Sequence, residues 1–310
     1  MIQLDILLQQ ILNGLVLGSV YALVALGYTM VYGILQLINF AHGDVLMVGA
    51  MVGVTVVASL AGSGLPGPAI LVLAIAAAVP ACVALSLFIE RVAYRPLRNA
   101  PRLAPLITAI GVSIVIQTVA MIIWKPNPIV FPDLLPTTPV QIGGAMLAPK
   151  QILVLVVAAL MMAGLMLLVN RTRLGRAMRA TAENPRIAGL MGVNANQVIA
   201  ATFAIGAALA AVAGVLVALN YNIAHFSMGF IPGLKAFTAA VLGGIGNLAG
   251  AMVGGLLLGL IESLGAGYIG DLTGGFLGSH YQDIFAFIVL IVVLVFRPSG
   301  IMGERVADRA

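Results

Sequence analysis

Eight apolar stretches, most of them long enough to cross a lipid bilayer as a helix, constrain this chain more than any other feature. A transmembrane helix needs about 20 mainly apolar residues. The stretches cover residues 6–27, 45–60, 69–89, 103–124, 151–169, 198–219, 248–264 and 284–296. Two further apolar segments, 28–38 and 236–245, are too short or too rich in glycine to assign. The pattern predicts an all-α, polytopic transmembrane bundle of about eight spans, with additional re-entrant or broken helices.

The composition agrees with a lipid environment. Hydrophobic residues make up 62% of the chain and charged residues 8%, whereas soluble domains carry about 25% charge. The 36 glycines suit close contact between helices, which in lipid depends on small side chains. The single cysteine, Cys82, is expected to be a small buried side chain. We therefore expect residues 1–310 to form one transmembrane domain that retains its first span.

The basic residues indicate the orientation. Nine of the 15 lysines and arginines lie in two short segments, 91–102 and 170–197, which predicts that both are cytoplasmic and argues against a nucleic-acid surface. The proline-rich segment 125–150 between them is expected to be an ordered extracytoplasmic loop. Eight simple crossings would leave both termini outside, yet arginines follow the last span. The conflict disappears if one unassigned segment crosses, or if one span only re-enters.

A five-residue sequence occurs twice. Gly-Ala-Met-Val-Gly stands at 49–53 and again at 250–254, each time at the start of an apolar stretch. Transporters are often built from two related halves with broken helices. Chance is the alternative explanation, since the chain is rich in these residue types.

The second cytoplasmic loop, 170–197, contains the pattern of a short helix. Thr181 is a candidate N-cap, and Pro185 is suited to the first turn. Gly192 and Asn194 are suited to ending the helix with a left-handed residue. The apolar face comprises Ile187, Leu190 and Met191. An exposed apolar face needs a partner protein or, alternatively, the membrane surface.

A first group of polar residues, Asn39, His42 and Asp44, interrupts two apolar segments. Polar groups at membrane depth are costly and are candidates for function. Irregular backbone is tolerated there only against protein or a water-filled cavity. We expect the group to line a cavity on the translocation pathway, where its exposed amides and carboxylate would be able to receive the zwitterion of an amino acid. The alternative is a helix cap and turn with His42 satisfied locally.

A second group lies in the C-terminal half and comprises Asn220, Tyr221, Asn222, His225, Lys235 and Thr238. Asn220, Asn222, Lys235 and Thr238 are the further candidates for the pathway. Lys235 either extends to the lipid headgroups or lies at an interface with a partner. Glu262, within an apolar stretch, requires a partner or a proton.

Several motifs are missing from the sequence. It contains no G-x-x-x-x-G-K-[ST] motif for ATP and no H-E-x-x-H or His/Cys cluster for a metal. Ser113 has no plausible base nearby in the sequence, so no nucleophile is apparent. We expect a non-catalytic chain that binds no cofactor or metal.

Four motifs resemble the branched-chain amino-acid permeases of the LivH type, a family of ABC-importer membrane components. They are INFAHGD at 38–44, ERVAYRPLR at 90–98, GFIPGLKAFTAAVLGGIG at 229–246 and PSGIMG at 298–303. With the second basic loop, the resemblance extends from about residue 10 to 303. In this family that loop inserts a short helix into a groove on the ATPase. The implied docking residues are Thr181, Glu183, Ile187, Leu190, Met191 and Gly192. The loop departs from the Glu-Ala-Ala…Gly pattern of other permease classes, so Glu183 and Gly192 are approximate counterparts.

The resemblance implies a multi-pass subunit of the bacterial inner membrane that translocates leucine, isoleucine and valine. The implied partners are a second, LivM-like permease, two cytoplasmic ATPases that carry ATP and magnesium, a periplasmic amino-acid-binding protein and membrane lipid. Urea or short-chain amides are the alternative substrates, since the same importer class carries them. A stand-alone channel or secondary transporter would place several charges on its pathway, and a membrane enzyme would need a catalytic constellation absent here.

Overall fold

The computed structural model describes residues 2–98, 100–101, 103–274 and 282–303. The α-helices are α1 (Ile2–Leu35), α2 (His42–Leu60), α3 (Gly67–Ile89), α4 (Leu103–Trp124), α5 (Pro149–Arg171), α6 (Arg173–Glu183), α7 (Pro185–Leu190), α8 (Ala195–Tyr221), α9 (Phe230–Gly243), α10 (Leu248–Leu272) and α11 (Gln282–Phe296). A π-helical turn, η1 (Glu90–Tyr94), and a 3₁₀ turn, η2 (Arg95–Leu97), follow α3. The strands are β1 (Ile129–Val130), β2 (Val140–Ile142), β3 (Ala145–Leu147) and β4 (Ile223–Ala224).

The predicted helical bundle is confirmed. Seven helices of the described chain are long and apolar enough to span a membrane, and α9 and part of α11 are shorter apolar helices. Each of the eight predicted stretches lies in a helix. Segment 28–38 is no separate element, because α1 continues without a break to Leu35. Most of segment 236–245 belongs to α9.

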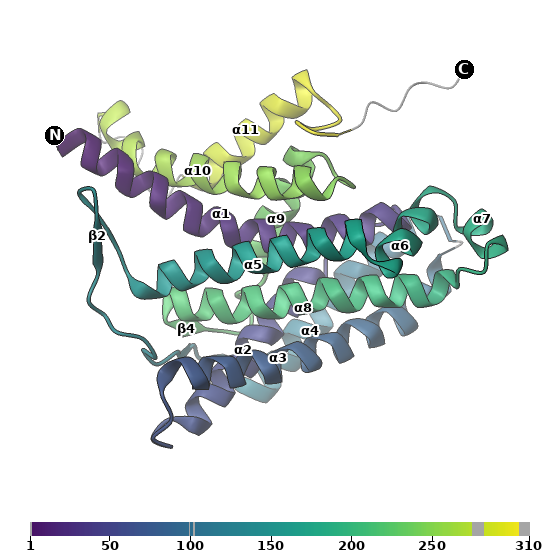
Figure 1. Cartoon of the computed structure of the whole chain (residues 1–310), viewed down its shortest axis with the longest axis horizontal. Coiled ribbons are helices and arrows are strands. Elements are labelled where there is room, and N and C mark those ends of the chain that lie inside the picture. The colour runs from purple at the N-terminus through teal and green to yellow at the C-terminus, as the bar shows by residue number, and fades with distance from the viewer. Residues whose placement is uncertain (1, 99, 102, 275–281, 304–310) are drawn as a thin grey trace.

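Contacts between helix ends establish which elements share a side of the bundle. Gln9, near the start of α1, donates to the Met146 carbonyl oxygen at 3.0 Å, so the N-terminus lies beside the predicted extracytoplasmic loop. Helices α6 and α7 lie at the opposite end of the bundle (Figure 1). Gly33, near the end of α1, faces Gly246, which places the start of α10 at that opposite end.

The conflict over the two termini is resolved by α9. This helix ends at the side of the bundle that carries α6 and α7, and Gly244 just beyond it packs against Gly303. With the basic loops cytoplasmic, the N-terminus is extracytoplasmic and the chain at Gly303 is cytoplasmic. Segment 236–245, as part of α9, therefore supplies the ninth crossing, which puts the two ends of the chain on opposite sides. The basic residues at positions 305 and 309 lie outside the described residues.

Helix α2 begins inside the protein, and helix α9 begins directly beside it, although its first residue, Phe230, is 60% exposed. The chain leaves helical geometry after α1 and resumes it at α2, whose first residue, His42, is 2% exposed. The predicted interruption of the helix is confirmed, but it covers residues 36–41, and Asp44 lies in the first turn of α2. Helix α9 likewise follows a largely non-helical segment, 222–229. The two starts touch, because a Cβ atom added at Gly43 would lie 2.6 Å from the Gly229 carbonyl oxygen.

Small residues allow the longest helix contact, between α1 and α10. A Cβ atom at Gly18 would lie 2.8 Å from the Leu256 Cα atom, so only glycine fits there. The repeated Gly-Ala-Met-Val-Gly sequence serves the same purpose in two places. Gly49 faces Ala211 of α8, and Gly250 faces Gly243 at the end of α9.

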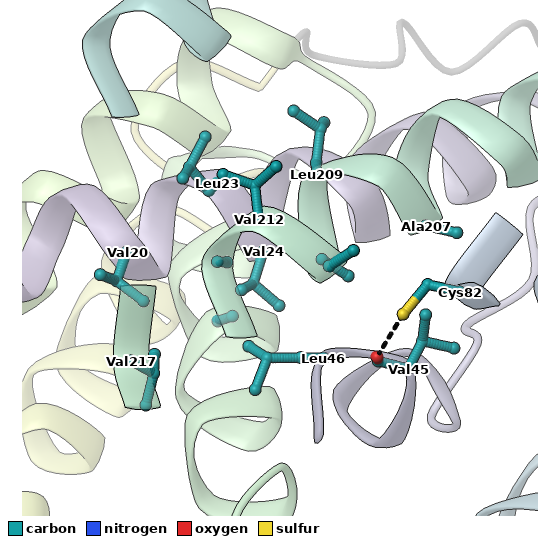
Figure 2. Close-up of a cluster of buried hydrophobic side chains, with 14 of the residues drawn as sticks. Val20, Leu23, Val24, Val45, Leu46, Cys82, Ala207, Leu209, Val212 and Val217 are labelled. Atoms are coloured by element: carbon teal, nitrogen blue, oxygen red, sulfur yellow. Dashed lines mark hydrogen bonds between the residues drawn. The ribbon is translucent and has the colours of Figure 1, made fainter. Parts of the chain in front are cut away.

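The core of the bundle joins α1, α2, α3 and α8. Figure 2 shows part of it, with Val20, Leu23, Val24, Val45, Leu46, Cys82, Ala207, Leu209, Val212 and Val217 labelled. Cys82 is fully buried, and its Sγ atom lies 3.3 Å from the Val45 carbonyl oxygen (Figure 2). The prediction of a small buried side chain at this position is confirmed.

Two short sheets order the extracytoplasmic loop. Strands β2 and β3 form an antiparallel hairpin, and β1 pairs with β4, which follows α8. Phe131 N also donates to the Asn222 carbonyl oxygen at 3.0 Å. The loop is thereby fixed to the segment that leads into α9.

Candidate translocation and docking sites

A cavity of about 810 Å³ lies between α4, the end of α8 and the start of α9. Its volume falls within the range of about 300–1,000 Å³ that is typical of small-molecule sites. Most of the wall is apolar. The polar lining residues are Tyr21, Ser113, Gln117, Tyr221, His225, Ser227 and Lys235.

A buried ion pair stands at the wall of the cavity. Lys235 Nζ lies 2.6 Å from Glu262 Oε1, and the two side chains are 8% and 3% exposed. Tyr21 OH donates to Glu262 Oε2 at 3.0 Å, while the ammonium lies 5.7 Å from the centre of the Tyr21 ring. Lys235 therefore does not extend to the lipid headgroups, and it supplies the partner that Glu262 required. Pairing makes two charges tolerable at this depth.

Asp44 lies directly behind another part of the wall. It is 2% exposed, and its Oδ1 atom accepts a hydrogen bond of 2.9 Å from Gln117 Nε2. Gln117 also lies 3.3 Å from Ser113 Oγ. Sequence reasoning missed Gln117, although an amide within an apolar span was a signal that could have found it.

Three other predicted pathway residues, Asn39, His42 and Thr238, are buried where helices pack together. Asn39 accepts a hydrogen bond of 2.9 Å from Tyr94 OH, and the His42 ring meets the Tyr28 ring edge-on at 5.0 Å. Thr238 OH donates to the carbonyl of Leu234 within α9. The described cavity contains none of the three. Of the seven predicted pathway residues, only Lys235 lines it.

Asn222 belongs to the extracytoplasmic face instead. It ends α8 in a left-handed conformation with φ of +56°, and its side chain bonds to Lys150 Nζ and Asp133 Oδ1. These three residues line a smaller cavity of about 360 Å³. Asn220, half-buried in the last turn of α8, is not among the residues that line it.

The predicted cytoplasmic loop forms two helices, α6 and α7. Asn184 is the N-cap of α7, since its Oδ1 accepts hydrogen bonds from Arg186 N at 3.0 Å and Ile187 N at 3.1 Å. The prediction of Thr181 as the N-cap is wrong. Thr181 is fully buried inside α6 and donates to the Ala177 carbonyl oxygen, so it is also not on the exposed docking surface. Asparagine directly before a proline is a better start signal than a threonine three residues earlier.

Helix α7 carries an exposed apolar face, as predicted. Ile187, Leu190 and Met191 are 58%, 84% and 80% exposed. We call these three residues the α7 face. Glu183 is exposed at the end of α6, and Gly192 ends α7 with φ of +84°. Asn194 has φ of −81° and caps α8, so its prediction as a left-handed end of α7 is wrong.

An apolar helical bundle with a largely apolar cavity that carries a few polar groups, and with an exposed apolar helix on its basic side, defines a polytopic membrane transport protein. The chain matches the family described as "Branched-chain amino acid transport system / permease component" over residues 10–294. It is 50% identical over 307 residues to the high-affinity branched-chain amino acid transport system permease protein BraD of Pseudomonas aeruginosa, with 97% of each chain covered. It is 45% identical over 307 residues to the permease protein LivH of Escherichia coli, again with 97% of each chain covered. The ribose import permease protein RbsC of Escherichia coli is 30% identical over 135 residues, covering 41% of this chain and 40% of that protein. The chain therefore belongs to the branched-chain amino acid transport system permease family, which confirms the resemblance of its motifs.

Proposed function

We propose that this chain is the permease subunit of an ATP-driven importer that carries leucine, isoleucine and valine across the bacterial inner membrane. The names of its full-length relatives support the substrate class. The observation that carries the proposal is the cavity, which combines an apolar wall with a small number of polar groups. The wall suits a branched aliphatic side chain, and the polar groups suit its ammonium and carboxylate.

The charges of the cavity suit a zwitterion. The pair of Lys235 and Glu262 places both signs of charge close together and adds no net charge. Gln117 contributes an amide from the facing helix, α4. A substrate with one positive and one negative group can therefore pass without leaving a charge uncompensated in lipid.

The α7 face is the proposed docking surface for a cytoplasmic ATPase. Its three apolar side chains are more than half exposed on the cytoplasmic side, and such a face is stabilised by burial against a partner. The sequence has no nucleotide-binding motif, so we place ATP and magnesium on two partner ATPases and regard this chain as non-catalytic. A second, LivM-like permease completes the pathway.

An amino-acid-binding protein in the periplasm is the proposed source of substrate. The extracytoplasmic cavity beside Asp133 and Lys150 faces the side from which it would deliver. Specificity then rests largely on the binding protein, and the permease cavity need only tolerate the substrate.

The test is uptake into proteoliposomes that contain this chain, the partner permease, the ATPases and the binding protein. Labelled leucine, isoleucine and valine are compared with urea, with and without ATP on the ATPase side. We expect ATP-dependent accumulation of the three amino acids. Accumulation of urea alone would overturn the substrate, and uptake that ignores ATP would overturn the importer class.

A further inference from the structure

A polar network crosses the cytoplasmic end of the bundle at η1. Arg98 Nη2 forms an ion pair with Glu90 Oε1, and Arg98 Nη1 donates to Asn196 Oδ1 at 2.6 Å. At the other end of the same turn, Tyr94 OH donates to Asn39 Oδ1 at 2.9 Å. The network therefore joins the first turn of α8 to the segment between α1 and α2. Single π-helical turns occur frequently at functional sites.

The α8 end of this network is tied closely to the docking helix. Asn194 caps α8 and accepts a hydrogen bond of 3.1 Å from Asn196 N. Val193 N donates to the Ala188 carbonyl oxygen of α7 at 3.0 Å. Because no long loop separates α7 from α8, a displacement of α7 reaches Asn196 directly.

The other end of the network meets the start of α2. Asn39 is 3% exposed and Tyr94 is 1% exposed, so both groups are held inside the protein. His42 is the first residue of α2, and its backbone N–H donates to the Asn39 carbonyl oxygen at 3.0 Å. Asp44, two residues further on, is hydrogen-bonded to Gln117 in the cavity wall. These three hydrogen bonds and the first turn of α2 therefore connect η1 to the cavity wall.

The guanidinium of Arg98 bonds to both η1 and α8, through Glu90 and Asn196. Its side chain is 18% exposed and that of Glu90 is 6% exposed, so the pair is poorly screened by water. Arg98 Nε is buried without a hydrogen-bond partner among the described residues. The guanidinium has five N–H donors, and this spare donor allows a second arrangement of its bonds. An element with two arrangements is what coupling between distant sites requires.

We propose that Arg98 is a positioning residue that transmits movement of the docked α7 through Asn196 and η1 to the start of α2 at the cavity. This inference rests on the proposed function, in which α7 docks an ATPase. Arg98 touches neither nucleotide nor substrate. Its loss should therefore separate ATP hydrolysis from transport without abolishing hydrolysis.

The experiment measures leucine uptake and ATP hydrolysis together in the proteoliposomes that contain the complete importer. We expect Arg98→Gln to lower the leucine imported per ATP by about tenfold, within the roughly 5- to 150-fold range of coupling between sites, while hydrolysis continues. Arg95→Gln is the matched control. Arg95 lies in η2 and is exposed, and its side chain forms no hydrogen bond or ion pair among the described residues, so its variant should keep the wild-type ratio.

A second variant guards against misfolding. Arg98→Gln leaves the buried Glu90 carboxylate without its counter-charge, whereas Glu90→Gln/Arg98→Gln removes both charges. The double variant should fold and should still show the lowered ratio. A wild-type ratio in either folded variant would overturn the role of Arg98. A wild-type importer without ATP-dependent uptake would overturn the proposed function, and this inference with it. An active wild-type importer whose Arg98 variants keep the same ratio would overturn this inference alone.

Discussion

The buried pair of Lys235 and Glu262 predicts a large loss of stability when only one partner is removed. The nitrogen-to-oxygen distance is 2.6 Å, and the side chains are 8% and 3% exposed. Removing one partner of such a pair costs about 3–5 kcal/mol, because the remaining charge is left uncompensated. Lys235→Met keeps most of the apolar stem and removes the ammonium. We therefore expect its free energy of unfolding to fall by about 3–5 kcal/mol.

The measurement is reversible unfolding of the purified permease in detergent, with the double variant Lys235→Met/Glu262→Gln beside the single one. The double variant has no charge left to bury, so it should recover at least half of the loss. The Tyr21 hydroxyl remains available to the new amide. If Lys235→Met unfolded within about 0.5 kcal/mol of the wild type, as a neutral surface substitution does, the carboxylate would be protonated or hydrated and the reasoning would be refuted.

Three further outcomes follow from the packing and the docking surface. Leu190→Asp, at an 84% exposed position, should abolish co-purification of the ATPases while the permease keeps its wild-type melting temperature. Gly43→Ala should destabilise the fold by at least about 1–3 kcal/mol, because the new methyl group meets a facing backbone oxygen at 2.6 Å. Gly111→Ala, where the added carbon meets no atom within 4 Å beyond its own stretch of helix, is its control and should melt no lower than the wild type, because alanine favours a helix over glycine. Gln117→Leu removes the donor to buried Asp44 and should lower the free energy of unfolding by about 1–3 kcal/mol, measured in the same detergent titration.

The spans were predictable from sequence because each is a continuous apolar run that lipid requires. Helix α9 was the exception. It is only 14 residues long, and it follows a non-helical segment that contacts Gly43 instead of belonging to a long apolar run. Hydropathy measures length and apolarity, so it cannot tell a short crossing helix from a buried loop. The conflict between the two termini was the sequence signal that one such helix existed.

The sites were predictable only in part. The α7 face follows a local spacing of three and four residues, and the structure has it exposed. The partner of Glu262 lies 27 residues away on another helix, so no local pattern could reveal the pair. Gln117 escaped notice because it is a single uncharged residue, and its importance lies in its contact with Asp44, 73 residues earlier. Polar residues such as His42 marked the break in the helix correctly, but only the tertiary structure separated packing residues from cavity residues.

Two neighbouring residues of α4 allow the central claim, that substrate crosses through the cavity, to be tested directly. Ile114 and Val115 are 60% and 61% exposed, but Ile114 lines the cavity whereas Val115 lines an apolar groove beside α3. The native thiol of Cys82 is buried and should remain unmodified. The measurement is ATP-dependent leucine uptake by the complete importer carrying Ile114→Cys or Val115→Cys, before and after a bulky thiol reagent. Modification should block uptake at position 114 and spare it at position 115. Full uptake by the modified Ile114→Cys importer would contradict a pathway through the cavity.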